Sequence, residues 1–134
     1  MKKLLLGICA AALVLSSAGE ASASVVPDNW VSSWFVHAGG LKVRANGNIS
    51  MTYQTYYKRD GGLPTFPQIR MRVKSANGKR LVGRVVAQRQ SRVAVGTRFT
   101  IIEKAPGVRL RFSGSRKVFQ FCDRWHLERG DCGA

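Results

Sequence analysis

The sequence predicts an all-β protein, a single small antiparallel barrel or sandwich of about seven or eight strands. The first observation behind this prediction is the alternation of apolar and polar residues along most of the chain after residue 24, as in strands that bury one face. The second is that turns rich in glycine, proline and asparagine separate these segments. No long stretch of this part repeats apolar residues at helical spacing, so little helix is expected.

The first 23 residues are predicted to be a cleaved signal peptide. Lys2 and Lys3 precede an apolar run at residues 4–15, and residues 21–23 read Ala-Ser-Ala, the small-residue pattern of a cleavage site. The run is shorter than the ~20 residues of a membrane-spanning helix, although an uncleaved membrane anchor is the alternative. Residues 24–134 are therefore expected to form one β-domain, secreted or otherwise extracytoplasmic, with no transmembrane span.

The same alternation places the strands along this domain. They are expected at residues 41–43, 49–57, 69–73, 81–87, 93–95, 98–102, 108–112 and 118–122. Residues 105–107, Ala-Pro-Gly, are expected to form a turn. A short helix is expected near residues 28–34 or between the two C-terminal cysteines, and Trp34 and His37 are expected to cover one end of the barrel.

Two turns share the tripeptide Ala-Asn-Gly, and the burial of apolar residues selects their loop length. In the second hairpin a two-residue Asn77-Gly78 turn would place Arg84 opposite Met71 on the apolar face, which is costly for a charge. A three-residue loop with a G1 bulge avoids this, because a one-residue slip reverses every facing. The predicted pairs are then Val43–Ile49 and Leu41–Met51 in the first hairpin, and Ile69–Val85, Met71–Gly83 and Val73–Leu81 in the second.

The domain is strongly basic. Without Lys2, Lys3 and Glu20 the chain keeps 20 basic and 6 acidic side chains, a formal net charge of +14, which is beyond the charge of about 2 to 8 that solubility requires. Glu103 is the only acidic residue of positions 64–122. Such a field attracts polyanions, and arginine suits phosphate and carboxylate groups because its guanidinium can bind them through two hydrogen bonds.

The predicted pairing gathers basic side chains on the outward face of the strands. Arg70 would lie opposite Arg84 and Lys74 opposite Arg80, although like charges in opposite positions destabilise a sheet. A solvated face is the alternative interpretation. We expect instead that this face binds a polyanionic surface or polymer, such as a cell-envelope polymer, anionic lipid or extracellular nucleic acid. The expected binding residues are Arg70, Arg72, Lys74, Arg80, Arg84, Arg109 and Arg111.

Two cysteines remain once the signal peptide is removed, Cys122 and Cys132. In an oxidising compartment a disulfide is expected between them, and closing so short a loop would stabilise the fold by roughly 2–3 kcal/mol. A metal site made by the two cysteines with His126 and His37 is the alternative, but the spacing matches no common zinc pattern. Neither a metal nor another cofactor is therefore expected.

Two other classes of function are alternatives to a non-enzymatic binding domain. A protein-interaction or inhibitor module could present a loop such as residues 58–68 to its partner. A small secreted nuclease could use Glu103, His37 and His126 for acid/base chemistry beside arginines that hold the phosphate. Neither histidine lies in a segment that resembles a microbial ribonuclease motif, so the binding domain is the preferred prediction.

The segment WFVHAGGLKVRANG, residues 34–47, contains a Trp, a His three residues later, a Leu-x-Val strand and an Asn-Gly turn. The chain then ends with Phe121-Cys122 and, at residues 132–134, Cys-Gly-Ala. These features resemble small exported β proteins of unknown function from actinobacteria. The resemblance covers the two ends of the mature domain and implies export, a single β-domain and the terminal disulfide. It implies no activity and no catalytic residue.

Overall fold

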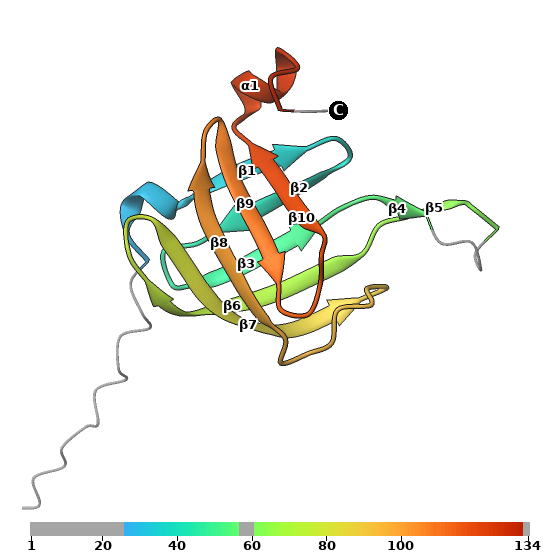
Figure 1. The fold of residues 1–134 in the computed structure, drawn as a ribbon, viewed down its shortest axis with the longest axis horizontal. Coiled ribbons are helices and arrows are strands. Elements are labelled where there is room, and N and C mark those ends of the chain that lie inside the picture. Colours follow the sequence, from blue (N-terminus) through green and yellow to red (C-terminus); the bar gives the residue numbers. More distant parts are fainter. Residues whose placement is uncertain (1–25, 57–60, 133–134) are drawn as a thin grey trace, which may run out of the picture.

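The computed structural model describes residues 26–56 and 61–132. In these ranges the chain forms a closed antiparallel barrel of eight strands, which confirms the predicted fold class (Figure 1). The predicted signal peptide, residues 1–23, lies outside the described residues, as does the start of the predicted partner-binding loop. Neither helix in the described ranges has the length and apolar character needed to cross a membrane.

The strands follow one another around the barrel in the order β1-β10-β9-β8-β7-β6-β3-β2, and β4 pairs with β5 in a separate two-stranded arm. Their bounds are β1 Ser32–Val36, β2 Gly39–Val43, β3 Asn48–Thr52, β4 Thr55–Tyr56, β5 Pro64–Thr65, β6 Gln68–Ala76, β7 Arg80–Arg89, β8 Arg98–Lys104, β9 Gly107–Phe112 and β10 Val118–Cys122. A 3₁₀ helix, η1 (Asp28–Trp30), precedes the barrel, and a short helix, α1 (Arg124–Glu128), follows it.

The barrel interior is filled by the apolar residues of the alternating pattern. In β6, for example, Ile69, Met71 and Val73 are buried while the residues between them are exposed. Three phenylalanines, Phe99, Phe112 and Phe121, are fully buried and come from three neighbouring strands. Because each strand buries one face and exposes the other, the basic residues at the alternate positions are directed outward.

The strand predictions need three corrections. The strand expected at residues 49–57 is divided into β3 and β4, because the chain leaves the barrel after Thr52. Residues 93–95 form no strand but belong to the β7–β8 loop, in which Gly96 N–H donates to the Val85 carbonyl and turns the chain. Val93 packs against the core, whereas Val95 is 62% exposed. Strand β1 was not expected, because the run Trp34-Phe35-Val36 lacks alternation, yet it pairs with β2 along its whole length. Short helices occur at both of the places considered, as η1 and α1.

The register is as predicted in the first hairpin and wrong in the second. Val43 pairs with Ile49 as expected, but Val73 pairs with Gly83 rather than with Leu81. Three residues, 77–79, separate β6 from β7, so the turn lies one residue later than predicted. The side-chain oxygen of Asn77 accepts hydrogen bonds from the N–H groups of Lys79 and Arg80, at 2.8 and 2.9 Å. A bulge in β6 between Val73 and Ser75 accompanies this turn. Since the pairing shifts by two positions near Val73, apolar residues still face inward.

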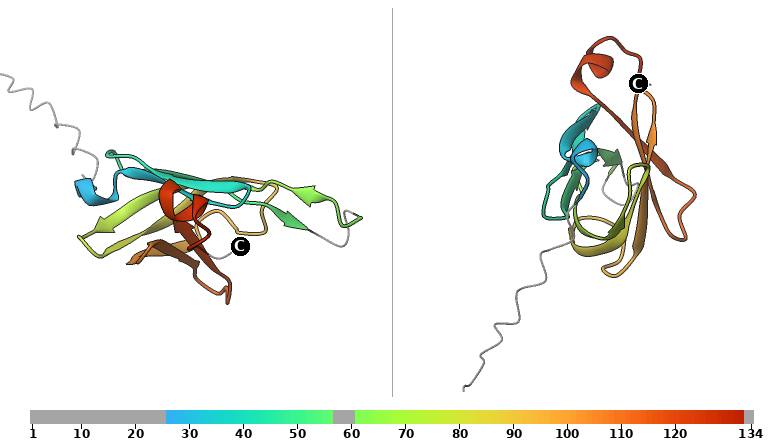
Figure 2. Two further views of the ribbon diagram at one scale, coloured as in Figure 1. Left: turned by 90° about the horizontal axis from the view of Figure 1, so that it is seen from above. Right: turned by 90° about the vertical axis from the view of Figure 1, so that its left-hand side faces the viewer.

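The end of the barrel beside η1 is closed by Trp30, not by the predicted pair. Trp30 is fully buried and its indole Nε1–H donates to the carbonyl of Asn77 in the β6–β7 turn, at 2.6 Å. Trp34 packs beside it in the core, with ring centroids 6.4 Å apart, whereas His37 is exposed in the β1–β2 turn. The β4–β5 arm leaves the barrel on the side away from η1 (Figure 2).

Candidate polyanion-binding site

All seven predicted binding residues are exposed on the outer face of the barrel, but the strands divide them. Three lie on β6, two on β7 and two on β9: Arg70, Arg72, Lys74, Arg80, Arg84, Arg109 and Arg111. Strand β8 separates β7 from β9. Because a closed barrel curves, residues several strands apart point in different directions, so the seven cannot form one flat surface.

Three arginines form a row across adjacent strands. Arg72 on β6 pairs with Arg84 on β7, and Arg84 in turn pairs with Arg98 on β8. Neighbouring strands are ~4.8 Å apart, so three positive charges are presented at short intervals. Arg84 is held in place because its Nη1 donates to the carbonyl of Gly96, at 2.8 Å. We call Arg72, Arg84 and Arg98 the arginine row. The predicted pairs Arg70–Arg84 and Lys74–Arg80 do not occur, because the register differs.

Beside this row is a hollow of about 440 Å³ on the outer face of β3, β6 and β7. Strand β3 pairs with β6, so that Asn48 lies opposite Arg72 and Ser50 opposite Arg70. The guanidinium of Arg44, just beyond β2, reaches over β3 and donates from Nη1 to Ser50 Oγ at 2.6 Å. We call this hollow the arginine groove; its lining residues are Arg44, Asn48, Ile49, Ser50, Arg70, Met71, Arg72, Val86 and Ala87.

A second hollow of about 380 Å³ continues the arginine groove toward the end of β7. Arg70 and Ala87 line both hollows, and the second adds Gln68, Gln88 and Arg89. Among the described residues, no acidic side chain lines either hollow. The two together therefore present the side chains of four arginines, with amide and hydroxyl groups between them that can also donate hydrogen bonds.

The remaining predicted residues lie apart from the groove. Arg80 and Arg109 flank Ile102 on β8, one on each side. The guanidinium of Arg109 is bonded to a neighbour on the next strand, since its Nε donates to Gln120 Oε1 at 2.8 Å. Arg111 lies opposite Thr100, and Lys74 lies at the β6 bulge. None of these residues lines either hollow.

Three arginines that line the two hollows or belong to the arginine row were absent from the predicted set: Arg44, Arg89 and Arg98. Arg44 directly follows the strand predicted at residues 41–43, and its place in the groove depends on the pairing of β3 with β6, which the sequence pattern did not predict. Arg89 lies beyond the end of the strand predicted at residues 81–87. Strict alternation along β7 would direct it inward, but a shift of register in the β6–β7 pairing brings it to the outward face, so the pattern could not find it. Arg98 begins a strand that was predicted, at residues 98–102, where it alternates with the inward-facing Phe99, but the prediction did not show that it lies opposite Arg84.

The candidate nuclease residues are not brought together. Asn29 Nδ2 donates to Glu103 Oε1 at 3.0 Å near η1, whereas His126 lies in α1, where its Nδ1 is 2.6 Å from Asp123 Oδ2. His37 is exposed in the β1–β2 turn. Within residues 26–56 and 61–132, Glu103, His37 and His126 form no hydrogen bond or ion pair with one another.

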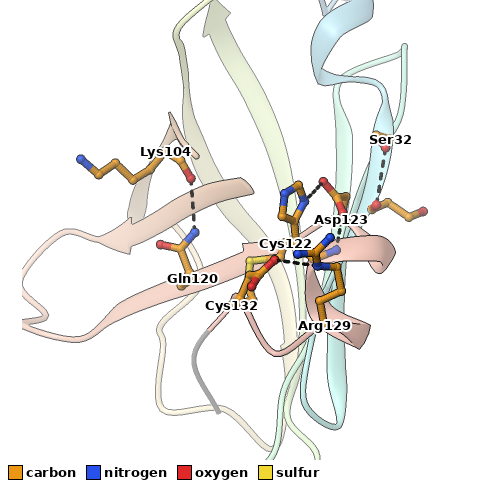
Figure 3. Close-up of polar contacts among 10 residues, drawn as sticks. Ser32, Lys104, Gln120, Cys122, Asp123, Arg129 and Cys132 are labelled. Carbon is orange, nitrogen blue, oxygen red and sulfur yellow. Dashed lines mark hydrogen bonds and ion pairs between the residues drawn. A yellow bond between two sulfur atoms is a disulfide. The ribbon is translucent and has the colours of Figure 1, made fainter. Parts of the chain in front are cut away.

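The C-terminal loop is organised by a disulfide and a helix cap. Cys122 and Cys132 form the predicted disulfide, as Figure 3 shows. Asp123 caps α1: its Oδ1 accepts the backbone N–H of His126 at 2.8 Å, and its Oδ2 contacts the imidazole. That backbone hydrogen bond, followed by the side-chain bond, holds the pKa of Asp123 below its ordinary value. Within the described ranges no group of three His, Cys, Asp or Glu side chains could hold a metal ion.

The arginine groove carries the hydrogen-bond donors that anionic groups accept, and among the described residues its lining contains no carboxylate and no histidine that could act as acid or base. Comparison with protein-family models, with curated proteins and with solved structures finds nothing that matches this chain.

Proposed function

We propose that the protein is an exported polyanion-binding domain and that the arginine groove is its binding site. The observation that carries the proposal is the convergence of Arg44, Arg70 and Arg72 on one hollow with no acidic lining residue among those described. The guanidinium groups suit the phosphate, sulfate or carboxylate groups of a polymer. The chain's net charge of +15 supports fast encounter with any such polymer.

The arginine row gives a bound polymer a path beyond the groove. Arg72 belongs to both features, so a chain seated in the groove can continue over Arg84 and Arg98 on β7 and β8. The second hollow, with Arg89, extends the path in the other direction along β7. Repeated contacts of this kind favour a polymer over a single small anion, because each phosphate contact releases counterions and adds to the affinity.

The test compares two triple variants of equal charge. One removes the groove arginines: Arg44→Ala, Arg70→Ala and Arg72→Ala. The control removes three exposed basic residues outside both hollows: Lys79→Ala, Lys104→Ala and Arg116→Ala. Binding of labelled heparin, polyphosphate, single-stranded RNA and anionic vesicles is followed by fluorescence anisotropy or co-sedimentation over a range of salt concentrations. The polymer retained at the highest salt identifies the chemical class.

We expect the groove variant to bind at least about tenfold more weakly than the control, and its plot of log affinity against log salt to be shallower by about two to three. The control should lose only the affinity that a lower net charge predicts. Equal losses in the two variants would show that the protein attracts polyanions through its net charge alone and that the groove is not a site.

A stability measurement on Arg72→Glu examines the arginine row itself. The substitution replaces the like-charged pair Arg72–Arg84 by an opposite-charged pair, so urea denaturation at low salt should show a gain of about 0.2–1 kcal/mol. The same protein should bind polyanions more weakly. Arg111→Glu is the control, since Arg111 faces Thr100 and Val118 instead of another arginine, and it should gain no stability. A less stable Arg72→Glu protein would contradict repulsion within the row.

A second candidate function, a protein-interaction module, is supported by the β4–β5 arm. Tyr56, Leu63 and Phe66 on this arm are 61%, 69% and 50% exposed, and the arm projects from the barrel (Figure 1). Exposed apolar residues gathered on one element are typical of binding surfaces. A partner captured by the wild type but not by Leu63→Ser/Phe66→Ser, with binding unaffected by salt, would favour this function over polyanion binding.

A further inference from the structure

Strand β10 has a free edge. It pairs with β9 at five positions, Val118 to Cys122, but on its other side it pairs with β1 only where Cys122 meets Phe35. Strand β1 ends at Val36, and the chain then turns back into β2. In Figure 1 only the end of β10 next to α1 lies beside β1. Along the remaining four residues of β10, no strand of the described chain pairs with this edge, and such an edge is a template for another strand.

A hollow of about 680 Å³ lies along this free edge. Its lining includes residues 117–121 and, from the end of β1 and the segments that follow β1 and β3, Val36, His37, Tyr53 and Gln54. It also extends over β10 to Arg109 on β9 and to the β8–β9 turn. Four residues of strand extend about 13 Å, so the edge accommodates a short extended segment. A strand that adds there would satisfy its own backbone groups through β10, which is the way that exposed sheet edges bind peptides.

Aromatic rings line the hollow. The rings of Tyr53 and Phe119 meet edge to face, with centroids 5.0 Å apart, and Phe119 is only partly buried. The ammonium group of Lys117 lies 5.2 Å from the Tyr53 ring and 4.7 Å from the Phe119 ring. An added strand places alternate side chains on opposite faces, so the side chain directed inward beside Phe119 would meet this aromatic surface and should be apolar.

The charges at the hollow are mostly positive. Lys117 and Arg109 both line it, and the single described carboxylate in its lining, Asp131, already forms an ion pair with Arg129 at 3.4 Å. Arg109 lies on the outward face of β9, one strand beyond β10, where it contacts Gln120. Lys117 directly precedes β10, and its ammonium group lies at the aromatic rings. Carboxylates on either side of the apolar residue of an added strand would complement these two positive charges.

We propose that the free edge of β10 binds an extended peptide segment in which acidic and apolar residues alternate, added to the barrel as a further strand. The site lies outside the arginine groove, and no residue lines both hollows. Peptide binding and polyanion binding are therefore separate properties, and either can fail without the other.

The test uses the labelled peptide acetyl-Glu-Phe-Glu-Val-Glu-amide and the purified protein. A peptide of the same composition and charge, acetyl-Glu-Glu-Glu-Phe-Val-amide, controls for attraction to a basic protein. Two further peptides are N-methylated, one at the Phe and Val amides and the other at the Glu amides, so that each loses the hydrogen bonds of one edge. Affinity is measured by fluorescence anisotropy, and the site is mapped by ¹⁵N NMR.

We expect the alternating peptide to bind about tenfold more tightly than the rearranged one, and only one of the two methylated peptides to lose this affinity. Amide shifts should concentrate at residues 118–121. Lys117→Glu should weaken binding by about tenfold, whereas the neighbouring Arg116→Glu, outside the hollow, should change it by less than about twofold. The groove variant Arg44→Ala/Arg70→Ala/Arg72→Ala should bind the peptide normally.

Three results would overturn the proposal. Equal affinity for the alternating and rearranged peptides would show attraction by charge alone. Full affinity of both methylated peptides would show that the hollow takes side chains without adding a strand. Amide shifts confined to β3, β6 and β7 would place the acidic peptide in the arginine groove.

Discussion

Gly83→Ala is expected to destabilise the barrel by more than about 3 kcal/mol, a large part of the about 5–15 kcal/mol that holds a domain of this size together. A methyl group at this position would collide with the carbonyl oxygen of Arg72 on β6 and would lie 2.8 Å from Cε1 of Phe99 on β8. The first contact is with backbone and the second with a fully buried ring, so neither can move without displacing its strand.

Urea denaturation followed by fluorescence gives the free energy of unfolding for this variant. Gly78→Ala is the matched control, because a Cβ there meets no atom within 4 Å and the residue has no positive φ. It should lie within about 0.5 kcal/mol of the wild type. A Gly83→Ala protein as stable as Gly78→Ala would mean that β6 and β7 do not approach so closely. Because the clash is with Arg72, residual folded protein should also bind polyanions poorly.

The hairpins show how far burial alone determines the fold. In both, the alternation of apolar residues correctly predicted which side chains face the core, since exposing that set would forfeit most of the core's stability. Burial could not select the register of the second hairpin, because a shift by two residues leaves the same side chains facing the core. The side chain of Asn77 decides it, by accepting two backbone N–H groups within the turn. Such local capping competes with the regular turn, and its outcome depends on three-dimensional geometry.

The arginine groove could be predicted from the sequence only in part. That Arg70 and Arg72 face outward follows from alternation, but their meeting with Arg44 requires β3 to pair with β6. Strands β4 and β5 lie between them and pair in the same register, Thr55 with Thr65, so β3 and β6 continue one long hairpin. Alternation does not show which strands pair with each other, so it could not reveal this pairing or the free edge of β10. Only the closed arrangement shows that β1 ends before it can cover β10.

Trp30→Ala is expected to cost about 3–5 kcal/mol, the usual loss when a fully buried tryptophan is truncated. The indole of Trp30 is completely buried at the end of the barrel beside η1. Its removal would leave a cavity and would deprive the Asn77 carbonyl of the Nε1–H that it accepts at 2.6 Å. Because Asn77 also organises the β6–β7 turn, the loss should spread to the hairpin that carries the arginine row.

Two further variants separate packing from hydrogen bonding at this position. Trp30→Phe keeps most of the buried ring but loses the indole donor, so its unfolding free energy should fall between those of the wild type and Trp30→Ala. Trp125→Ala is the control, since Trp125 is 56% exposed in α1 and should cost less than about 1 kcal/mol. If Trp30→Ala were no less stable than Trp125→Ala, Trp30 would not close the barrel. In that case η1 would be an appendage of the fold, and the adjacent β6–β7 turn would have to be stabilised by Asn77 alone.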